Sequence, residues 1–495
     1  MPPRALILAF LLACSLAPSL AFGAKDARDL EASLARLTEV VRLLETRSAE
    51  PVDLEDAVYH GAVPALVRAL DPFSAFLDPA QFESLQEMQR STEKGFGSVL
   101  SVNNGRVVVL QTLPDSPSAR SGMSPGDEII VVNGHPTANL SIDQLVALLS
   151  QTRQAPADLA VKRPNFARLI PLTLTPAELE DPSVQGAFFV KPGVAYVKVA
   201  NFESQTDADL REQIEEMGGE ELRGLVLDFR DNPGGVIEAA VRMAALFLDE
   251  KDRILWIQGR DGPQEEVRVP KGAKGYQFPL AVLTDQRTAS AAELVAGAWQ
   301  DNDRALIVGT RSFGKGLVQS VFPLTEGTGL ALTTARYLSP SGRPIQRPLS
   351  DCAELQLDDC EQETPKTYKT VSGRKIPGGG GVQPDRIIYP RSHSPFEYFL
   401  MSADAFLVFA QTYTRDHPEI EATFEVDSSL LNEFQTFLSQ RGVRPTLSEW
   451  GSSLEFVRMK LHQEILTLAV GVAAGDEVER RADPQVLAAV QELGL

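Results

Sequence analysis

The sequence predicts a multidomain α/β protein, built around a mixed β-sheet with helices packed on it and with helical regions at both ends. Its 495 residues are enough for several domains, and a hydrophobic content of 43% is enough to give them cores. Between residues 194 and 309, short apolar runs typical of buried strands alternate with amphipathic helical patterns. It is this alternation that predicts the sheet and its helices.

The composition restricts the class of partner. A formal net charge of −20 argues against a nucleic-acid partner, because a phosphate backbone would be repelled. The chain has five histidines and three cysteines, but neither a His-Glu-x-x-His nor a paired Cys-x-x-Cys motif. Neither a metal site nor another cofactor is therefore expected.

Residues 1–23 have the pattern of a targeting segment. Arg4 gives a positive start, Ala5–Ala13 an apolar run, and Ala21-Phe22-Gly23 a small-x-small cleavage site. We therefore predict that the protein is exported to a bacterial periplasm or cell envelope. An alternative is a lipoprotein signal with Cys14 lipidated, a pattern that Leu12 fits poorly.

Two cysteines remain once this segment is removed. Cys352 and Cys360 lie in a polar stretch that we interpret as a surface insertion over residues 351–381. An even number of cysteines in an exported protein predicts a disulfide between them. The alternative is two unpaired thiols in the insertion.

Helices are expected in the two flanking regions, residues 24–85 and 391–495. In the first region, apolar residues recur at helical spacing: Leu30, Leu34, Leu37, Val41 and Leu44. In the second, one helical face carries Leu430, Leu431, Phe434, Phe437 and Leu438. This second face forms either the core of its region or a contact in a homodimer, and the sequence leaves both open.

Residues 278–320 contain the side chains from which we infer chemistry. An apolar run over Phe278–Leu283 is followed by a short turn and by Ser290-Ala291-Ala292-Glu293, which opens a helical pattern. A second apolar run ends in Gly309, and the polar loop after it contains Lys315. Ser-x-x-Glu is by itself a capping box, and a single lysine is by itself a surface charge. Together they lie at the ends of neighbouring strands, where open α/β sheets place ligands.

This stretch resembles the serine–lysine core of the carboxyl-terminal processing peptidases, also called tail-specific proteases. Their pattern is a serine between two alanines before a glutamate, then a Phe-Gly-Lys-Gly loop and a glutamine four residues past the lysine. The matching positions here are Ala289-Ser290-Ala291, Glu293, Phe313-Gly314-Lys315-Gly316 and Gln319. Many members have a further serine where this chain has Ala292.

The resemblance implies a role for each matching residue. Ser290 is implied as the nucleophile, Lys315 as its general base, and Gln319 as the residue that orients the Lys315 amine. The resemblance also implies a core over residues 176–390 with the Clp-protease/crotonase-like fold. A serine at a helix start has free backbone N–H groups beside it, which suit an oxyanion.

A second turn resembles the family's oxyanion hole. Asn232-Pro233-Gly234-Gly235 follows a buried strand and precedes a helical pattern. The resemblance implies that the N–H groups of Gly234 and Ala291 bind the oxyanion, with Gly235 as the alternative if the turn is shifted by one residue. Without the resemblance, the turn is an ordinary strand-to-helix connection.

Residues 86–175 resemble a PDZ domain. The resemblance rests on two segments, Asp115-Ser116-Pro117-Ser118-Ala119 and Pro125-Gly126-Asp127, and it implies that Gly95-Phe96-Gly97-Ser98 is the carboxylate-binding loop. Glycines let successive N–H groups converge on an anion, and an open strand edge accepts an extended peptide. A short amphipathic helix is expected over Ile142–Leu149.

Together these features predict a serine endopeptidase with a Ser–Lys dyad, which cleaves exported proteins after its PDZ domain binds their apolar C-terminal tails. An adaptor lipoprotein is a further partner to expect. A Ser-His-Asp site is not predicted, because no histidine lies near an obvious partner. Two alternatives remain: a catalytically silent PDZ adaptor with Ser290 only a cap, and a crotonase-like enzyme acting on a thioester, for which the sequence has no nucleotide-binding signature.

Overall fold

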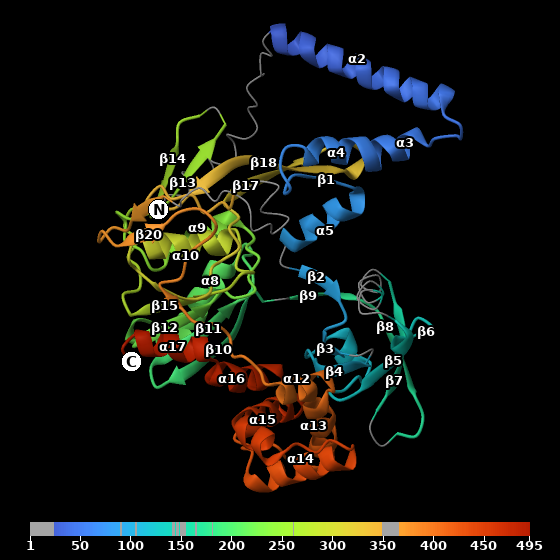
Figure 1. The fold of residues 1–495 in the computed structure, drawn as a ribbon, viewed down its shortest axis with the longest axis vertical. Coiled ribbons are helices and arrows are strands. Elements are labelled where there is room, and N and C mark those ends of the chain that lie inside the picture. The colour runs from blue at the N-terminus through green and yellow to red at the C-terminus, as the bar shows by residue number, and fades with distance from the viewer. Residues whose placement is uncertain are drawn as a thin grey trace. The chain divides into compact units, whose positions relative to one another are not determined.

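The computed structural model describes residues 24–89, 92–103, 106–140, 144, 148, 155–163, 166–180, 182–260, 262–348 and 366–495 (Figure 1). Several predictions fall outside these residues: the targeting segment with Cys14, most of the helix expected over Ile142–Leu149, and the pairing of Cys352 with Cys360. The chain divides into two parts, residues 1–76 with 330–332, and residues 77–329 with 333–495. Each part is described separately.

The smaller part is helical where the apolar spacing predicts helices. Its helices are α2 (Ala24–Arg47), α3 (Leu54–Asp56), the π-helix η1 (Ala57–Ala62) and α4 (Val63–Arg68). The apolar face of α2 is not buried, since Leu30, Leu34, Leu37 and Leu44 are each 41–53% exposed. The spacing therefore predicts the helix correctly, but this face forms no core within the described residues.

A six-stranded mixed sheet is the centre of the larger part. Its strands follow the order β10 (Val184–Lys191), β11 (Val194–Val199), β12 (Gly224–Asp228), β15 (Leu280–Thr284), β16 (Leu306–Gly309) and β21 (Arg386–Ile387). The first pair is antiparallel and the others are parallel. The central strands are mostly apolar and almost entirely buried, because both of their faces are covered.

Helices cover both faces of this sheet, as predicted. On one face, α8 (Thr206–Glu216), α9 (Ile237–Ala245) and α10 (Ala291–Asp301) contribute to the largest hydrophobic core (Figure 1). On the other, α17 (Pro484–Glu492) packs with Val486, Ala489 and Val490. This arrangement confirms a mixed sheet with helices packed on it, and it brings the carboxyl ends of the parallel strands to one edge.

A second, antiparallel sheet forms between residues 98 and 174. Its strands follow the order β3 (Ser98–Asn103), β4 (Arg106–Thr112), β5 (Glu128–Val132), β7 (Ala157–Lys162) and β8 (Ile170–Leu174). The two-residue strand β6 (His135–Pro136) pairs with β5, and β2 (Thr92–Gly95) pairs with β9 (Ala177–Glu180). Within the described chain, β3 pairs only with β4, so one edge of β3 has no neighbouring strand.

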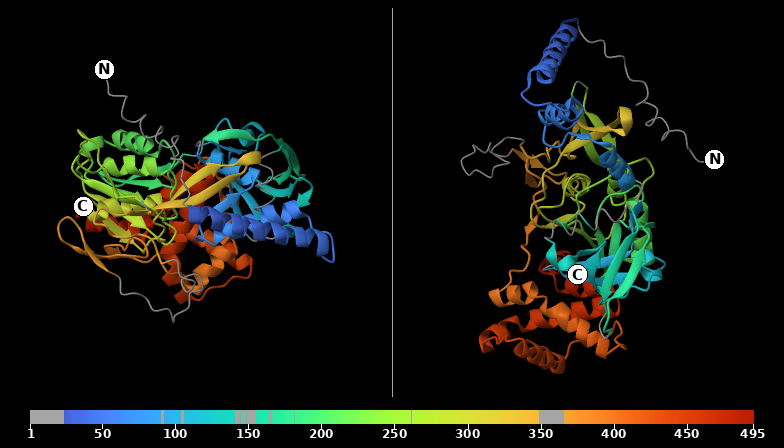
Figure 2. Two further views of the ribbon diagram at one scale, coloured as in Figure 1. Left: turned by 90° about the horizontal axis from the view of Figure 1, so that it is seen from above. Right: turned by 90° about the vertical axis from the view of Figure 1, so that its right-hand side faces the viewer.

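The C-terminal region is a helical bundle (Figures 1 and 2). It contains α12 (Pro395–Ser402), α13 (Ala405–Asp416), α14 (Ser428–Gln440), α15 (Leu447–Ala469) and α16 (Val472–Ala482). Leu430, Leu431, Phe434 and Leu438 are buried in its core together with Val108 of β4. Of the two interpretations of this face, the core within the chain is confirmed. None of the helices in the described ranges is long and apolar enough to cross a membrane.

Candidate active site

Ser290 lies just after the turn that leaves β15, and it is the N-cap residue of α10. Its backbone has φ 54° and ψ −116°, a conformation that non-glycine residues rarely adopt and that costs on the order of 1–3 kcal/mol. Its hydroxyl makes no capping hydrogen bond. Strained residues of this kind cluster at functional sites, so the geometry favours a chemical role for this side chain over a capping role.

Lys315 lies in the loop that leaves the neighbouring strand, β16, and it precedes β17 (Leu317–Pro323). Strands β15 and β16 are parallel, with Thr284 opposite Gly309, so both loops leave the same edge of the sheet. The Lys315 amine donates a hydrogen bond to Oε1 of Gln319, at 2.8 Å. The structure therefore places together the lysine and glutamine that the sequence pairs.

Glu293 connects the two loops through their backbone N–H groups. Its Oε2 accepts hydrogen bonds from the N–H of Ser290, at 2.9 Å, and from the N–H of Lys315, at 2.8 Å. Its Oε1 accepts from the Ser312 hydroxyl, at 2.5 Å, and from the Gly314 N–H, at 2.7 Å. Burial raises the pKa of Glu293 to about 7, although these hydrogen bonds favour the charged form.

Tyr337, in β18 (Gly329–Leu338), contacts the same two residues through their carbonyls. Its hydroxyl oxygen lies 2.7 Å from the carbonyl oxygen of Ser290 and 2.6 Å from that of Lys315. The side chain is almost fully buried. Burial raises the pKa of Tyr337 well above its usual value, so the hydroxyl keeps its proton and remains a donor.

The turn after β12 packs directly against Ser290. Gly234 has φ 99°, and a Cβ at this position would lie 2.8 Å from the Ser290 Cβ and 2.9 Å from the Ala291 nitrogen. No side chain fits there, which explains the glycine. The Ala289 N–H donates to the Asn232 carbonyl at 2.9 Å, which fixes the turn to the chain that leads into Ser290.

The N–H groups of this region differ in their partners. The Gly234 N–H donates to Oδ1 of Asn232 at 2.8 Å, so it is occupied in this structure. The backbone hydrogen bonds of the described residues include none donated by Gly235 or Ala291. Among the described residues, the N–H groups of Ala291 and Gly235 therefore have no backbone acceptor, whereas that of Gly234 is bonded to Asn232.

The loop predicted to bind a carboxylate, residues 95–98, precedes the open strand β3. Gly97 has φ 71°, and a Cβ there would lie 2.2 Å from the Ser116 Cβ. The carbonyls of Phe96 and Gly97 accept hydrogen bonds from the N–H groups of Ser118 and Leu113, both at 2.8 Å. No backbone hydrogen bond of the described residues is donated by Phe96 or Gly97. The loop thus turns its carbonyls inward and has two uncommitted N–H groups.

Comparisons with known proteins identify the families of two parts of the chain. The PDZ domain model matches residues 85–162, and the model of peptidase family S41 matches residues 193–350. The carboxyl-terminal-processing protease of Synechocystis sp. is 32% identical over 304 residues, which cover 58% of this chain and 68% of the relative. The chloroplastic C-terminal processing peptidase of Tetradesmus obliquus is 32% identical over 325 residues, covering 62% and 70%.

The chain belongs to peptidase family S41. A more distant relative, the carboxy-terminal processing protease CtpA of Bacillus subtilis, is 26% identical over 366 residues, covering 70% of this chain and 75% of the relative. The protein is accordingly a serine-type peptidase of the C-terminal processing group, and it has a PDZ domain.

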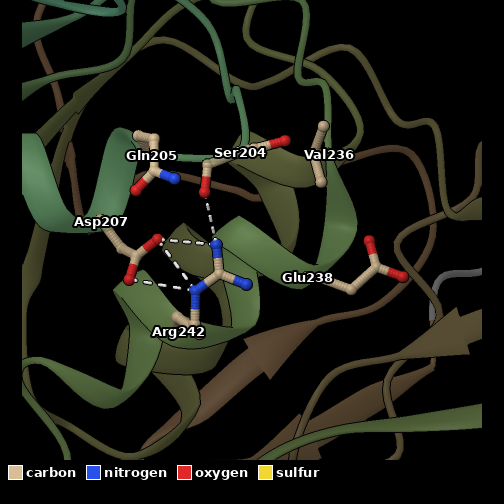
Figure 3. A pocket seen from close by; sticks show the side chains of 6 residues that line it. All are labelled: Ser204, Gln205, Asp207, Val236, Glu238 and Arg242. Carbon is tan, nitrogen blue, oxygen red and sulfur yellow. Dashed lines mark hydrogen bonds and ion pairs between the residues drawn. The ribbon is translucent and has the colours of Figure 1, made fainter. Parts of the chain in front are cut away.

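A pocket of about 550 Å³ lies beside the Pro-Gly-Gly turn of this S41 peptidase (Figure 3). Its lining consists of Ser204, Gln205, Asp207, Val236, Glu238 and Arg242. Arg242 is held in place by Asp207, with Nε 3.0 Å from Oδ1, and by the Ser204 carbonyl at 2.7 Å. Val236 connects the pocket to the turn, since its N–H donates to the Phe202 carbonyl at 2.8 Å and it directly follows Gly235.

Two features of the S41 site could not be read from the sequence. Glu293 has a recognisable signal, the capping-box pattern, but that pattern does not predict its hydrogen bonds to the lysine loop. Tyr337 has no local signal, because it lies within an ordinary strand pattern 47 residues after Ser290. The residues covered by the structure contain no group of three or more His, Cys, Asp or Glu side chains that could hold a metal ion.

Proposed function

We propose that this S41 peptidase cleaves exported proteins with Ser290 as nucleophile and Lys315 as general base, after its PDZ domain has bound their apolar C-terminal tails. The observation that carries the proposal is the carboxylate oxygen shared by the two residues, Oε2 of Glu293. It ties a strained serine to a lysine whose amine is already held by Gln319. A capping serine and a surface lysine need no such connection.

The proposed reaction follows from these positions. The Ser290 Oγ attacks the scissile carbonyl while Lys315, in its neutral form, takes the hydroxyl proton. The C–N bond then breaks, Lys315 gives the proton to the leaving amine, and an ester to Ser290 remains. Water attacks this ester, Lys315 accepts a proton from the water, and that proton returns to the Ser290 oxygen. Gln319 keeps the amine directed through both steps.

The oxyanion that forms in each step needs two N–H donors. Ala291 supplies one at the start of α10, where the helix dipole also favours negative charge. For the second we propose Gly235, because the Gly234 N–H is bonded to Asn232, whose fully buried amide also donates to the Val199 carbonyl at 2.8 Å. Loss of one such donor typically costs about 10²- to 10³-fold in rate.

The variant Asn232→Ala tests this assignment by the direction of its effect. If Gly235 is the donor, loss of the Asn232 amide loosens the turn and lowers kcat. If Gly234 is the donor and Asn232 masks it, the same variant raises kcat. Steady-state cleavage of a short peptide distinguishes the two.

The PDZ loop and the free edge of β3 support capture of a C-terminal tail. The uncommitted N–H groups of Phe96 and Gly97 suit a terminal carboxylate, and the strand edge accepts an extended chain. We expect a substrate with a free carboxylate to be cleaved faster than the same substrate with an amidated end.

We also expect that occupancy of the PDZ loop changes the activity of the protease. A separate tail peptide should therefore change turnover, and equal rates with and without that peptide would contradict this expectation.

For export, the supporting observation is the targeting pattern of residues 1–23. We also propose a homodimer, and the observation that supports it is the half-exposed apolar face of α2. Sedimentation of the 53.8 kDa chain, with and without Leu34→Glu, tests the second proposal. The adaptor lipoprotein stays a prediction to which no surface is assigned.

The decisive experiment is proteolysis of an unstructured test protein with an apolar C-terminal tail. Wild type should cleave it, and Ser290→Ala and Lys315→Ala should abolish cleavage while remaining folded. Cleavage that survives Ser290→Ala would contradict the assignment of the nucleophile. Binding of the tail without cleavage by wild type would instead favour the silent adaptor.

A further inference from the structure

We propose that Tyr337 is a positioning residue for the Ser–Lys pair, and that its hydroxyl acts with the Glu293 carboxylate as one buried clamp on the backbones of Ser290 and Lys315. The inference rests on the proposed function, since it concerns how the nucleophile and the base are held.

The clamp contacts four backbone groups through two side-chain atoms. Both N–H groups, of Ser290 and Lys315, donate to Oε2 of Glu293 at 2.9 and 2.8 Å. Both carbonyl oxygens lie within hydrogen-bond distance of the Tyr337 hydroxyl, at 2.7 and 2.6 Å. Each catalytic residue is therefore held at its N–H and at its C=O, and by the same two atoms as its partner.

The loops that carry these residues come from different strands. Their backbones meet where the Phe313 N–H donates to the Thr288 carbonyl at 2.9 Å, and Glu293 and Tyr337 connect them at Ser290 and Lys315 themselves. Ser290 is strained, with φ 54°, and a strained backbone persists only where its surroundings restrain it. The backbone of Tyr337 is held by two neighbours. Its N–H donates to the Gly316 carbonyl at 3.0 Å, and in the sheet it pairs with Ile257 of β13 (Arg253–Gly259). The phenol thus projects from a rigid strand into the gap between the two loops.

The hydroxyl has one proton and two carbonyl acceptors. Removing the oxygen takes this donor away from both carbonyls. The Ser290 carbonyl keeps the N–H of Leu294, at 3.0 Å, so the cost of a lost hydrogen bond falls mainly on the carbonyl of Lys315. The loops then relax toward other donors, and the serine oxygen moves away from the lysine amine. A displacement of about 1 Å between reacting groups can lower a rate by about 10²-fold.

A purely structural role for Tyr337 makes a different prediction. Its ring lies in the same hydrophobic core as Tyr276, whose hydroxyl donates a hydrogen bond to the exposed side chain of Glu215. If both tyrosines serve only packing and hydrogen-bond satisfaction, then removing either hydroxyl should affect stability alone. Tyr276→Phe is therefore a matched control for Tyr337→Phe.

The test measures kcat, KM and thermal unfolding of the full-length chain for wild type, Tyr337→Phe and Tyr276→Phe, with one peptide substrate. We expect kcat of Tyr337→Phe to fall about 10- to 100-fold with KM within about twofold, because the loops position the reacting groups rather than the bound peptide. Tyr276→Phe should keep both parameters. Equal kcat for Tyr337→Phe and wild type would overturn the inference while leaving the protease intact.

A second variant addresses the case in which Tyr337→Phe unfolds. Replacing Tyr337 with p-aminophenylalanine keeps a ring and restores an N–H donor at nearly the same position. Recovery of kcat by this residue supports the clamp. A folded p-aminophenylalanine variant whose kcat stays about 10-fold or more below that of wild type contradicts it. An inactive wild type would instead contradict the proposed function itself.

Discussion

The same sequence pattern begins three helices of this protein and gives two different structures. Ser394…Glu397 opens α12 and Thr446…Glu449 opens α15, and both are ordinary capping boxes with extended N-cap residues, at φ −70° and −67°. In each, the hydroxyl accepts a hydrogen bond from the third helical N–H at 3.2 Å. At α10, the N-cap residue Ser290 has φ 54°, and its hydroxyl caps nothing.

The glutamates of these boxes also differ in what else they contact. Glu397 of α12 is buried and accepts a hydrogen bond from Arg391 at 2.9 Å. In α15, Glu449 is exposed and bonds only to Thr446. In α10, Glu293 is fully buried and also accepts hydrogen bonds from the lysine loop. The capping-box glutamate of α10 therefore also binds the lysine loop, and this is a tertiary contact that the local pattern does not encode.

The largest difference in kcat is expected between variants of Ser290 and of Ser394. Ser290→Ala is expected to lower kcat on the order of 10⁴- to 10⁶-fold, as removal of a nucleophile does in other serine proteases, while the fold is retained. Ser394→Ala should keep kcat, because its hydroxyl contacts only the start of α12 and the hydroxyl of Ser453. Peptide cleavage and urea unfolding of both variants test this, and comparable loss of activity in the two would break the comparison.

A smaller difference in kcat is expected between variants of Glu293 and of Glu449. Glu293→Gln places an NH₂ group where the N–H donors of Ser290, Gly314 and Lys315 need an acceptor, so kcat should fall by about 10- to 100-fold and the free energy of unfolding by about 2 kcal/mol. Glu449→Gln should leave kcat unchanged. Full activity of a folded Glu293→Gln would show that the second loop does not depend on this carboxylate.

The two glutamates should also respond oppositely to pH. Burial raises the pKa of Glu293 from 4.5 to about 7, so the folded state holds this proton over a range in which the unfolded state has lost it. The free energy of unfolding should therefore fall as pH rises from about 5 to 7, by up to roughly 3 kcal/mol, and Glu293→Gln should flatten this slope. The hydrogen bonds from Thr446 lower the pKa of Glu449, so its contribution is present at neutral pH and is lost on acidification.

We expect kcat to depend on the same Glu293 titration, but to rise with pH where the free energy of unfolding falls. The groups that face the Glu293 carboxylate are all donors, the N–H groups of Ser290, Gly314 and Lys315 and the hydroxyl of Ser312, with the protonated Tyr337 nearby. Only the charged form accepts from all four. We expect kcat to rise from pH 6 to pH 8 and stability to decline over part of the same range. Chemical denaturation and initial rates at four pH values test both, and a kcat that is highest at pH 6 would contradict this account.

The smallest effect belongs to an ordinary cap. Thr446→Ala should lower the free energy of unfolding by about 1 kcal/mol and leave kcat unchanged, because α15 begins far along the chain from the strands that carry the site. Urea unfolding measures the first and peptide cleavage the second. A loss of activity here would mean that the C-terminal bundle influences the site directly.

Local patterns predicted much of this molecule. The apolar runs indicated β15 and β16, and the helical spacing of α14 indicated its buried face. The positions of Ser290 and Lys315 after those runs only suggested a shared site, and their roles came from the resemblance to the carboxyl-terminal processing peptidases. These features depend on residues close in sequence, where periodicity and capping are informative.

Long-range contacts decided the rest. The φ angle of Ser290, the clamp by Tyr337 and the bond between Asn232 and Gly234 all depend on a turn, a loop or a strand that packs from elsewhere. The apolar face of α2 is the converse case, a correct helix whose face forms no core in the described chain. Which side chains meet across strands is set by packing, so spacing alone could not show it.

The central claim is that Ser290, and neither of the two capping residues, is a nucleophile activated by Lys315. The most direct measurement is covalent labelling with a fluorophosphonate probe, followed by peptide mapping in a mass spectrometer, for wild type, Ser290→Ala and Lys315→Ala. We predict one label per chain at Ser290 in wild type, none in Ser290→Ala, and labelling slowed by at least about 10²-fold in Lys315→Ala, as loss of a general base implies. Labelling at another residue, or at an equal rate without Lys315, would contradict the account.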